Sequence, residues 1–282
     1  MANPRKKFDD LEFKRFTPSN LNHLIAALKP DDVKEQSVKI ATTDHSQMQD
    51  FPYFAVEFKA EKFIVFNVSK DSKSFNNETV LPYIGEVLNN FLKDHKEEKD
   101  STLLLPMRQC RGYGKARFFN HQLLKKEHIV LVEVNLAKQK ITVQDSQGDF
   151  MRQSLYPDVL KDISASLKMA YVYRGHNVQK DKFSCGYFVH QYIRARLKAG
   201  KEADLSKIKL ATVDSEHFKL SYIAKYMWPN DYLVFMKCEE EESRQEMFEQ
   251  FKKRYEAIDV GFNLPDPDAY DLPDEEDDFS LS

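Results

Sequence analysis

Cys185 and Gly186 open a run with helical spacing, in which apolar side chains recur every three or four residues up to Leu197. Ser184, directly before the cysteine, is expected to cap this helix, and Gly200 is expected to end it. A cysteine in the first turn lies beside unpaired backbone amides and the positive end of the helix dipole, which stabilise a thiolate. On this pattern alone, a small buried core cysteine is the commoner interpretation.

Two strand-like runs upstream bring a histidine and an aspartate to neighbouring ends. Residues 129–136 are rich in β-branched side chains, and residues 141–144 follow after the short turn AKQK. Strands joined this tightly pair antiparallel, so the start of the first lies beside the end of the second. His128 precedes the first strand and Asp145 follows the second, so we expect the carboxylate to accept the imidazole N–H and fix its tautomer.

Together these residues supply the groups that a cysteine hydrolase needs. We predict Cys185 as the nucleophile, His128 as the base and Asp145 as its orienter. Gln179 is expected to donate its side-chain amide to a developing oxyanion, beside the backbone N–H of the cysteine. Each residue alone has a commoner structural interpretation, as a core thiol, a loop histidine, a turn aspartate or a polar loop residue. Their order and spacing favour the catalytic interpretation.

The other cysteines and histidines fit these roles less well. Cys110 lies in a basic loop with no helix after it, and Cys238 precedes a run of glutamates, which disfavours a thiolate. His190 falls inside the nucleophile's helix, and His121 and His176 are alternative bases.

Composition excludes several other classes of protein. Apolar residues make up 41% of the 282, enough for a core, but no apolar run is long enough to span a membrane. The basic N-terminus lacks the apolar stretch of a Sec-type signal peptide, and three cysteines indicate a reducing compartment. Without CxxC or HExxH motifs we expect no metal and no cofactor. Interspersed acids and bases argue against a nucleic-acid partner.

The sequence predicts three regions. Residues 1–80 form a variable N-terminal region with an arm, a helix over 19–28 and a hairpin over 54–68; residues 81–262 form the catalytic domain; and residues 263–282 form an acidic disordered tail. Within the catalytic domain we expect further strands over 102–107 and 171–173, and further helices over 81–91, 150–169 (interrupted near Pro157), 216–227 and 240–257.

The chain resembles the CE-clan cysteine peptidases, which include the Ulp/SENP SUMO proteases, the adenovirus protease and bacterial effectors. Their motif is a histidine before a strand, an aspartate often followed by serine, a glutamine, and a Cys-Gly pair that opens a helix. The matching residues here are His128, Asp145 with Ser146, Gln179, and Cys185 with Gly186, within roughly residues 100–230. The resemblance implies an α+β, papain-like fold with a central mixed sheet and the nucleophile at a helix N-terminus.

The resemblance also implies a function, a thiol isopeptidase that removes ubiquitin or a ubiquitin-like modifier, such as SUMO or NEDD8, from conjugated proteins. Ulp-like enzymes usually have Trp after the histidine and Asp before the cysteine, where this chain has Ile129 and Ser184, so the modifier and the linkage stay open. One alternative is a YopJ-like Ser/Thr/Lys acetyltransferase that uses acetyl-CoA on the same triad. Its inositol phosphate activator would be held by Arg194, Arg196, Lys198, Lys201 and Lys207. Another is a catalytically inactive module that binds the modifier.

Two compositional features resemble those of bacterial effectors. The chain is poor in glycine and rich in Lys, Asn and Phe, and its acidic C-terminal end resembles the glutamate-rich signals of type IV secretion substrates. The resemblance implies a cytoplasmic protein, or a virulence protein that a bacterium secretes into the host cytosol. The sequence leaves the oligomeric state and the host substrate open.

Overall fold

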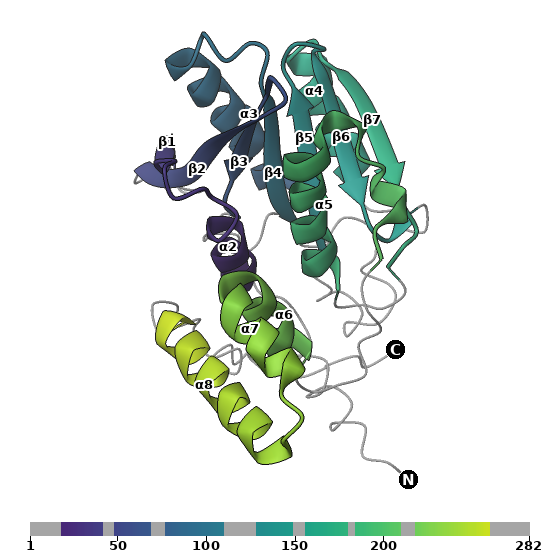
Figure 1. Cartoon of the computed structure of the whole chain (residues 1–282). Coiled ribbons are helices and arrows are strands. Elements are labelled where there is room, and N and C mark those ends of the chain that lie inside the picture. Colours follow the sequence, from purple (N-terminus) through teal and green to yellow (C-terminus); the bar gives the residue numbers. More distant parts are fainter. Residues whose placement is uncertain are drawn as a thin grey trace, which may run out of the picture. The chain divides into compact units, whose positions relative to one another are not determined.

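Seven strands and seven α-helices make up most of the part of the chain that the structure, a computed structural model, describes: residues 18–41, 48–68, 77–109, 128–148, 156–179, 184–209 and 218–259 (Figure 1). The strands are β1 (Gln36–Ala41), β2 (Met48–Phe58), β3 (Glu61–Phe66), β4 (Thr102–Gln109), β5 (His128–Asn135), β6 (Lys140–Asp145) and β7 (Ala170–Gly175). The α-helices are α2 (Pro18–Ala26), α3 (Asn77–Asp94), α4 (Tyr156–Ser166), α5 (Cys185–Ala199), α6 (Phe218–Met227), α7 (Pro229–Lys237) and α8 (Glu241–Asp259). Two short 3₁₀ helices, η3 (Gly200–Glu202) and η4 (Leu205–Lys207), follow α5.

All seven strands form one mixed sheet in the order of the sequence, β1 to β7. Neighbouring strands pair antiparallel except β3 with β4 and β6 with β7, which pair parallel. Both parallel pairs are separated in sequence by a helix, α3 or α4, as a parallel crossover requires. The structure is therefore a mixed α/β fold with the central mixed sheet that the resemblance implies.

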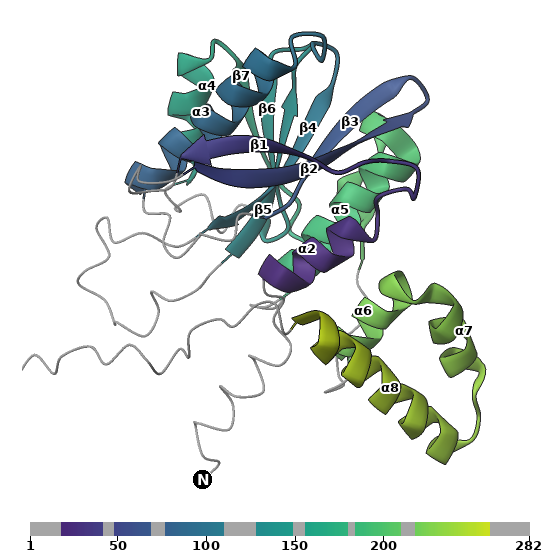
Figure 2. The same ribbon diagram turned by 90° about the vertical axis from the view of Figure 1, so that its left-hand side faces the viewer.

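Helices cover both faces of the sheet. Figure 2 shows α3 and α4 against one face, and α5 with α2 against the other. Double coverage explains the strand sequences, because a strand buried on both sides is apolar at consecutive positions. Phe63 to Phe66 of β3 are accordingly all buried, at 1% exposure or less.

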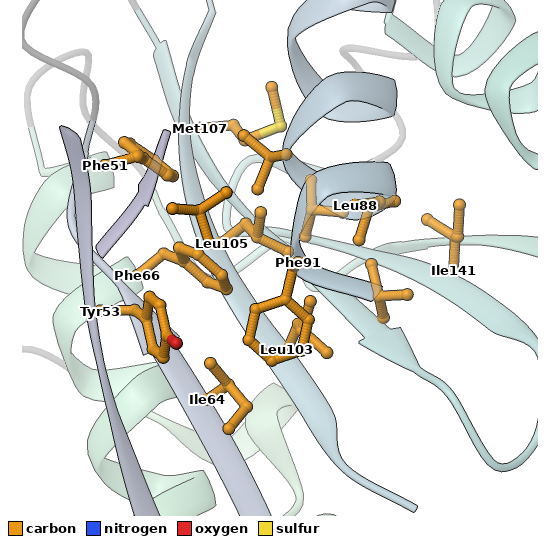
Figure 3. Close-up of a cluster of buried hydrophobic side chains, with 14 of the residues drawn as sticks. Phe51, Tyr53, Ile64, Phe66, Leu88, Phe91, Leu103, Leu105, Met107 and Ile141 are labelled. Atoms are coloured by element: carbon orange, nitrogen blue, oxygen red, sulfur yellow. The ribbon is translucent and has the colours of Figure 1, made fainter. Parts of the chain in front are cut away.

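The largest apolar core lies between the sheet and helix α3, with α4 beside it. Phe66 packs against both Tyr53 and Phe91, with ring centroids 5.1 and 5.9 Å apart, and Leu103, Leu105 and Met107 of β4 extend the cluster (Figure 3). Each such side chain contributes about 1.5–3 kcal/mol when it leaves water. This core fixes the strands whose ends carry the candidate site.

Two predicted features are confirmed close to their expected positions. β2 and β3 form the predicted hairpin, joined by Lys59 and Ala60, both with positive φ, as a two-residue hairpin turn requires. Helix α5 begins at Cys185, and Gly200, with φ of 74°, donates its N–H to the Arg196 carbonyl and ends the helix as predicted.

Other expectations are wrong or incomplete. Ser184 precedes α5, but its side chain makes no capping hydrogen bond to the helix. Pro157 lies in the first turn of α4, where a proline costs no hydrogen bond, and residues 150–155 of the predicted helix lie outside the described residues. Strand β1 and helix α7 come from segments for which the sequence predicted no element. β1 to β3 belong to the same sheet as the strands that carry the site. The boundaries at residues 80 and 262 stay predictions, and the predicted acidic tail lies outside the described residues.

The chain divides into two compact units, residues 1–234 and 235–282, and the site lies in the first. In the second, Phe235 packs against Phe248 and Phe251 of α8, with ring centroids 6.4 and 5.7 Å apart. Among the helices that the structure describes, none has the length and hydropathy that crossing a bilayer requires.

Candidate active site

The predicted histidine and aspartate meet where β5 begins and β6 ends. His128 is the first residue of β5 and Asp145 the last of β6, and the two strands pair antiparallel. The imidazole Nε2 lies 2.8 Å from Asp145 Oδ1, so the predicted contact is present. Both side chains are buried, at 3% exposure each, and the contact is therefore shielded from solvent.

Cys185, the first residue of α5, is the third member of the arrangement. The cysteine is 4% exposed, and its interaction with the His128 imidazole raises the pKa of that ring. Nε2 of the ring is held by Asp145, and the buried Nδ1 makes no hydrogen bond to the described residues, so Nδ1 is the nitrogen available to the thiol. A Cys–His–Asp alignment of this kind is the geometry that thiol hydrolysis requires.

Electrostatics favour the ionised forms of His128 and Asp145. Burial by itself lowers the pKa of His128, but the hydrogen bond to Asp145, the interaction with Cys185 and the charges of both outweigh it and raise the pKa to about 10. Burial raises the pKa of Asp145, but the His128 contact, the Gln147 amide and the Tyr173 hydroxyl together lower it. A protonated imidazole beside a cysteine is an arrangement that stabilises a thiolate.

Asp145 is held by more donors than the sequence revealed. Its Oδ1 also accepts the Gln147 backbone N–H at 2.8 Å, and its Oδ2 accepts the Tyr173 hydroxyl at 2.8 Å. Tyr173 comes from β7, which pairs parallel with β6. Sequence reasoning missed this tyrosine because its contact depends on the register across a crossover. The only signal was a tyrosine in the strand predicted over residues 171–173.

Gln179 lies beside Ser146, the residue that directly follows Asp145. It is 5% exposed, its backbone N–H donates to the Ser146 carbonyl at 2.9 Å, and its side-chain oxygen accepts the Ser146 hydroxyl at 2.7 Å. Because Oε1 receives the serine proton, the Nε2 amide is turned away from Ser146. The structure thus fixes the orientation of this amide, and its role as an oxyanion donor stays a prediction.

The alternative bases and nucleophiles are occupied elsewhere or lie outside the described residues. His176 contacts Gln144 through Nε2 at 2.7 Å, and burial and the Arg174 charge lower its pKa. His190 is fully buried against Tyr222, and burial followed by the Arg194 charge lowers its pKa to about 3. Cys238 lies in the second unit. Cys110 and His121 lie outside the described residues.

The basic residues expected to hold an activator do not form one exposed surface. Arg196 is buried and its Nε donates to Glu133 at 2.6 Å, while Arg194 donates to the Tyr226 hydroxyl at 2.9 Å. A polar cavity of about 390 Å³ lined by Arg196 lies at the Asn135 end of β5, the end opposite His128, and is not part of the candidate active site. In the described ranges, no group of three or more His, Cys, Asp or Glu side chains is arranged to hold a metal.

Comparisons with known proteins give structural likenesses only. No family model and no curated protein matches the chain. A crystal structure of the Legionella pneumophila effector protein RavZ is 14% identical, with a TM-score of 0.47 over 89% of this chain and 78% of that chain. ChlaDub1 from Chlamydia trachomatis is 15% identical, with a TM-score of 0.29 over 46% and 62%. The C-terminal Ulp1 protease domain, in complex with SMT3, the yeast ortholog of SUMO, is 12% identical, with a TM-score of 0.32 over 69% and 88%. The chain spans 64% of the length of two other RavZ structures.

The raised pKa of His128 gives a direct titration prediction. Its imidazole should stay protonated until about pH 10, whereas His190 in the same spectrum should be neutral at pH 7. Because the folded-state pKa lies above the unfolded-state value, the imidazolium's contacts stabilise the fold fully below about pH 6.5, and this contribution is lost as the pH rises through about 10. Histidine ring NMR titration measures both groups.

The matched variant for this titration is Cys185→Ala. Removing the thiol deletes one of the two groups that raise the pKa of His128, so this pKa should fall while that of His190 is unchanged. A His128 pKa near 6.5 in the wild-type protein would contradict the ion-pair description.

Proposed function

We propose that the chain is a thiol isopeptidase that removes ubiquitin or a ubiquitin-like modifier from conjugated proteins. The observation that carries this proposal is the alignment of a thiol, an imidazole and a carboxylate, with His128 Nε2 2.8 Å from Asp145 Oδ1 and Cys185 at the first residue of α5. The order of these residues along the chain, with Gln179 before the cysteine, matches the motif that the CE-clan resemblance rests on.

The reaction follows from the protonation states at the site. The Cys185 thiolate attacks the carbonyl carbon of the modifier's C-terminal glycine, and the resulting oxyanion is held by the Cys185 backbone N–H and the Gln179 amide. The His128 imidazolium then gives its proton to the leaving lysine amine, which leaves a thioester on the cysteine. A water molecule, deprotonated by His128, hydrolyses the thioester, which releases the modifier and restores the thiolate beside the protonated imidazole. Asp145 keeps the ring oriented throughout.

The burial of the Cys185 thiol favours a substrate that reaches it as a narrow, extended segment. With Cys185 4% exposed, an extended, flexible tail reaches the sulfur more readily than the surface of a folded domain does. A modifier ends in such a tail, and its folded body needs an interface of roughly 1,200–2,000 Å² elsewhere on the enzyme. We assign this recognition to residues 1–80 and 200–260, and we place the reaction in the cytosol of a bacterium or of its host.

A substrate panel tests the proposal against its alternatives. C-terminal fluorogenic amides of ubiquitin, SUMO and NEDD8 are incubated with the wild-type chain and with Cys185→Ala. Turnover of at least one substrate that Cys185→Ala loses supports the isopeptidase. If none is turned over and labelled acetyl-CoA instead acetylates Cys185, the acetyltransferase replaces it. Binding of a modifier without either reaction identifies a binding module and contradicts the proposal.

Gln179 gives a further prediction for this reaction. Gln179→Ala should lower kcat by about 10²- to 10³-fold, because a preorganised oxyanion donor is lost. Ser146→Ala should cost less, because it removes only the hydroxyl that orients the amide through its 2.7 Å hydrogen bond. Steady-state rates on the best substrate of the panel measure both. A Gln179→Ala enzyme within threefold of the wild type would remove this residue from the mechanism.

A further inference from the structure

Both oxygens of the Asp145 carboxylate accept hydrogen bonds, although the contact with His128 uses only Oδ1. Oδ1 accepts two donors, the His128 imidazole and the Gln147 amide, each at 2.8 Å. Oδ2 accepts the Tyr173 hydroxyl at the same distance. A carboxylate bonded at one oxygen can rotate about its Cβ–Cγ bond, whereas donors at both oxygens fix the plane of the group.

Tyr173 lies on β7, which is held in place by its pairing with β6. Tyr173 lies opposite Val143 in the parallel register of β6 and β7, and Gly175 lies opposite Asp145. Because alternate residues of a strand share a face, Tyr173 projects on the same face of the sheet as Asp145. Its ring packs against the main apolar core, which holds the aromatic body and leaves the hydroxyl at the carboxylate.

The same hydroxyl also approaches the backbone that follows Asp145. It lies 3.2 Å from the Gly148 carbonyl, farther than the 2.8 Å to Asp145 Oδ2. Gly148 adopts φ of +77°, and a Cβ there would lie 2.8 Å from Cβ of Asn177, so only glycine fits. The closely packed turn therefore keeps this backbone beside β7, where the tyrosine can reach both acceptors.

We propose that Tyr173 is a positioning residue that fixes the rotamer of Asp145, so that Oδ1 stays aligned with His128 Nε2 during turnover. Tyr173 acts through Asp145 rather than on the substrate. The expected effect of Tyr173 on kcat rests on the proposed function, whereas its expected effect on His128 rests on geometry alone. A hydrogen bond to a charged acceptor is among the stronger ones in proteins, so its loss has a measurable effect.

The test compares Tyr173→Phe with Tyr171→Phe. Tyr171 lies two residues earlier on the same strand and its hydroxyl is not bonded to Asp145, so it is a matched control. Tyr173→Phe should lower kcat about tenfold with KM unchanged, and 3-fluorotyrosine at this position, which keeps the donor, should restore kcat. The acid limb of the kcat profile should move to higher pH, because the Tyr173 hydroxyl is one of the groups that lower the pKa of Asp145.

A second readout needs no turnover and separates this inference from the proposed function. In Tyr173→Phe, but not in Tyr171→Phe, the NMR signal of the His128 Nε2–H proton should shift and broaden, because the carboxylate samples a second rotamer. An unchanged signal together with kcat within twofold of the wild type would overturn the positioning role. Equal losses in both variants would overturn it too, since they would report strand packing. If no substrate is turned over but the signal still changes, the positioning role stands while the proposed function fails.

Discussion

Replacing Asp145 by asparagine is expected to lower kcat by about 10³- to 10⁴-fold while the fold is retained. The Asp145 carboxylate accepts the His128 N–H at Oδ1 and the Tyr173 hydroxyl at Oδ2. An amide cannot keep both of these contacts. An asparagine side chain offers a single acceptor oxygen and no charge. The imidazolium then loses a contact that raises its pKa, and its orientation toward the thiol is no longer fixed.

Steady-state kinetics on the best modifier substrate measure this loss, and thermal melting confirms that the variant is folded. The matched control is Asp162→Asn, because Asp162 is an exposed acid on α4 and its charge change is the same. We expect this control to retain wild-type kcat. An Asp145→Asn enzyme that keeps more than about a tenth of the wild-type rate would show that the reaction does not use the Asp145–His128 contact.

The second large effect concerns stability. Arg196→Met should lower the free energy of unfolding by about 3–5 kcal/mol, because it leaves the carboxylate of Glu133 buried without a cationic partner. Arg196 donates to this carboxylate from Nε at 2.6 Å, and its Nη1 donates to the carbonyls of Lys201 and Ala203 at 3.1 and 2.8 Å. The residue thus joins β5, the end of α5 and the 3₁₀ segment after it.

A double variant separates an uncompensated charge from a general loss of packing. Arg196→Met with Glu133→Leu removes both charges, so it should recover most of the stability that the single variant loses. Lys198→Met, an exposed position on the same helix, should change stability by less than about 0.5 kcal/mol. Urea denaturation measures all three. A single-variant cost below about 1 kcal/mol would mean that the Glu133 charge is solvated in the folded protein.

The contact of His128 with Asp145 could be predicted because it is set by local geometry. A short turn forces two strands to pair antiparallel, and the residues at the open ends then meet without any knowledge of the rest of the fold. The start of α5 could also be predicted from local sequence, since a Cys-Gly pair before a helical hydrophobic pattern indicates where the first turn lies.

The support around the site could not be predicted, because it comes from contacts that cross the fold. Tyr173 reaches Asp145 through a parallel register that follows a helical crossover, and Glu133 meets Arg196 only when α5 lies on the sheet. In sequence, Glu133 interrupts an apolar strand and Arg196 falls in a basic run, so each suggests a solvent-exposed charge. In the folded structure the two side chains are instead buried and paired with each other, as partners in a buried ion pair must be.

The central claim is that Cys185, activated by His128 and Asp145, is the nucleophile, and peptide mapping of a covalent adduct tests it most directly. Ubiquitin, SUMO and NEDD8 that carry a C-terminal electrophile are incubated with the wild-type chain, which has three cysteines, and the adduct is digested and located by mass spectrometry. We predict an adduct at Cys185 with at least one modifier, lost on prior unfolding and strongly reduced in His128→Ala. An adduct at Cys110 or Cys238, or equal labelling of all three cysteines, would contradict the account.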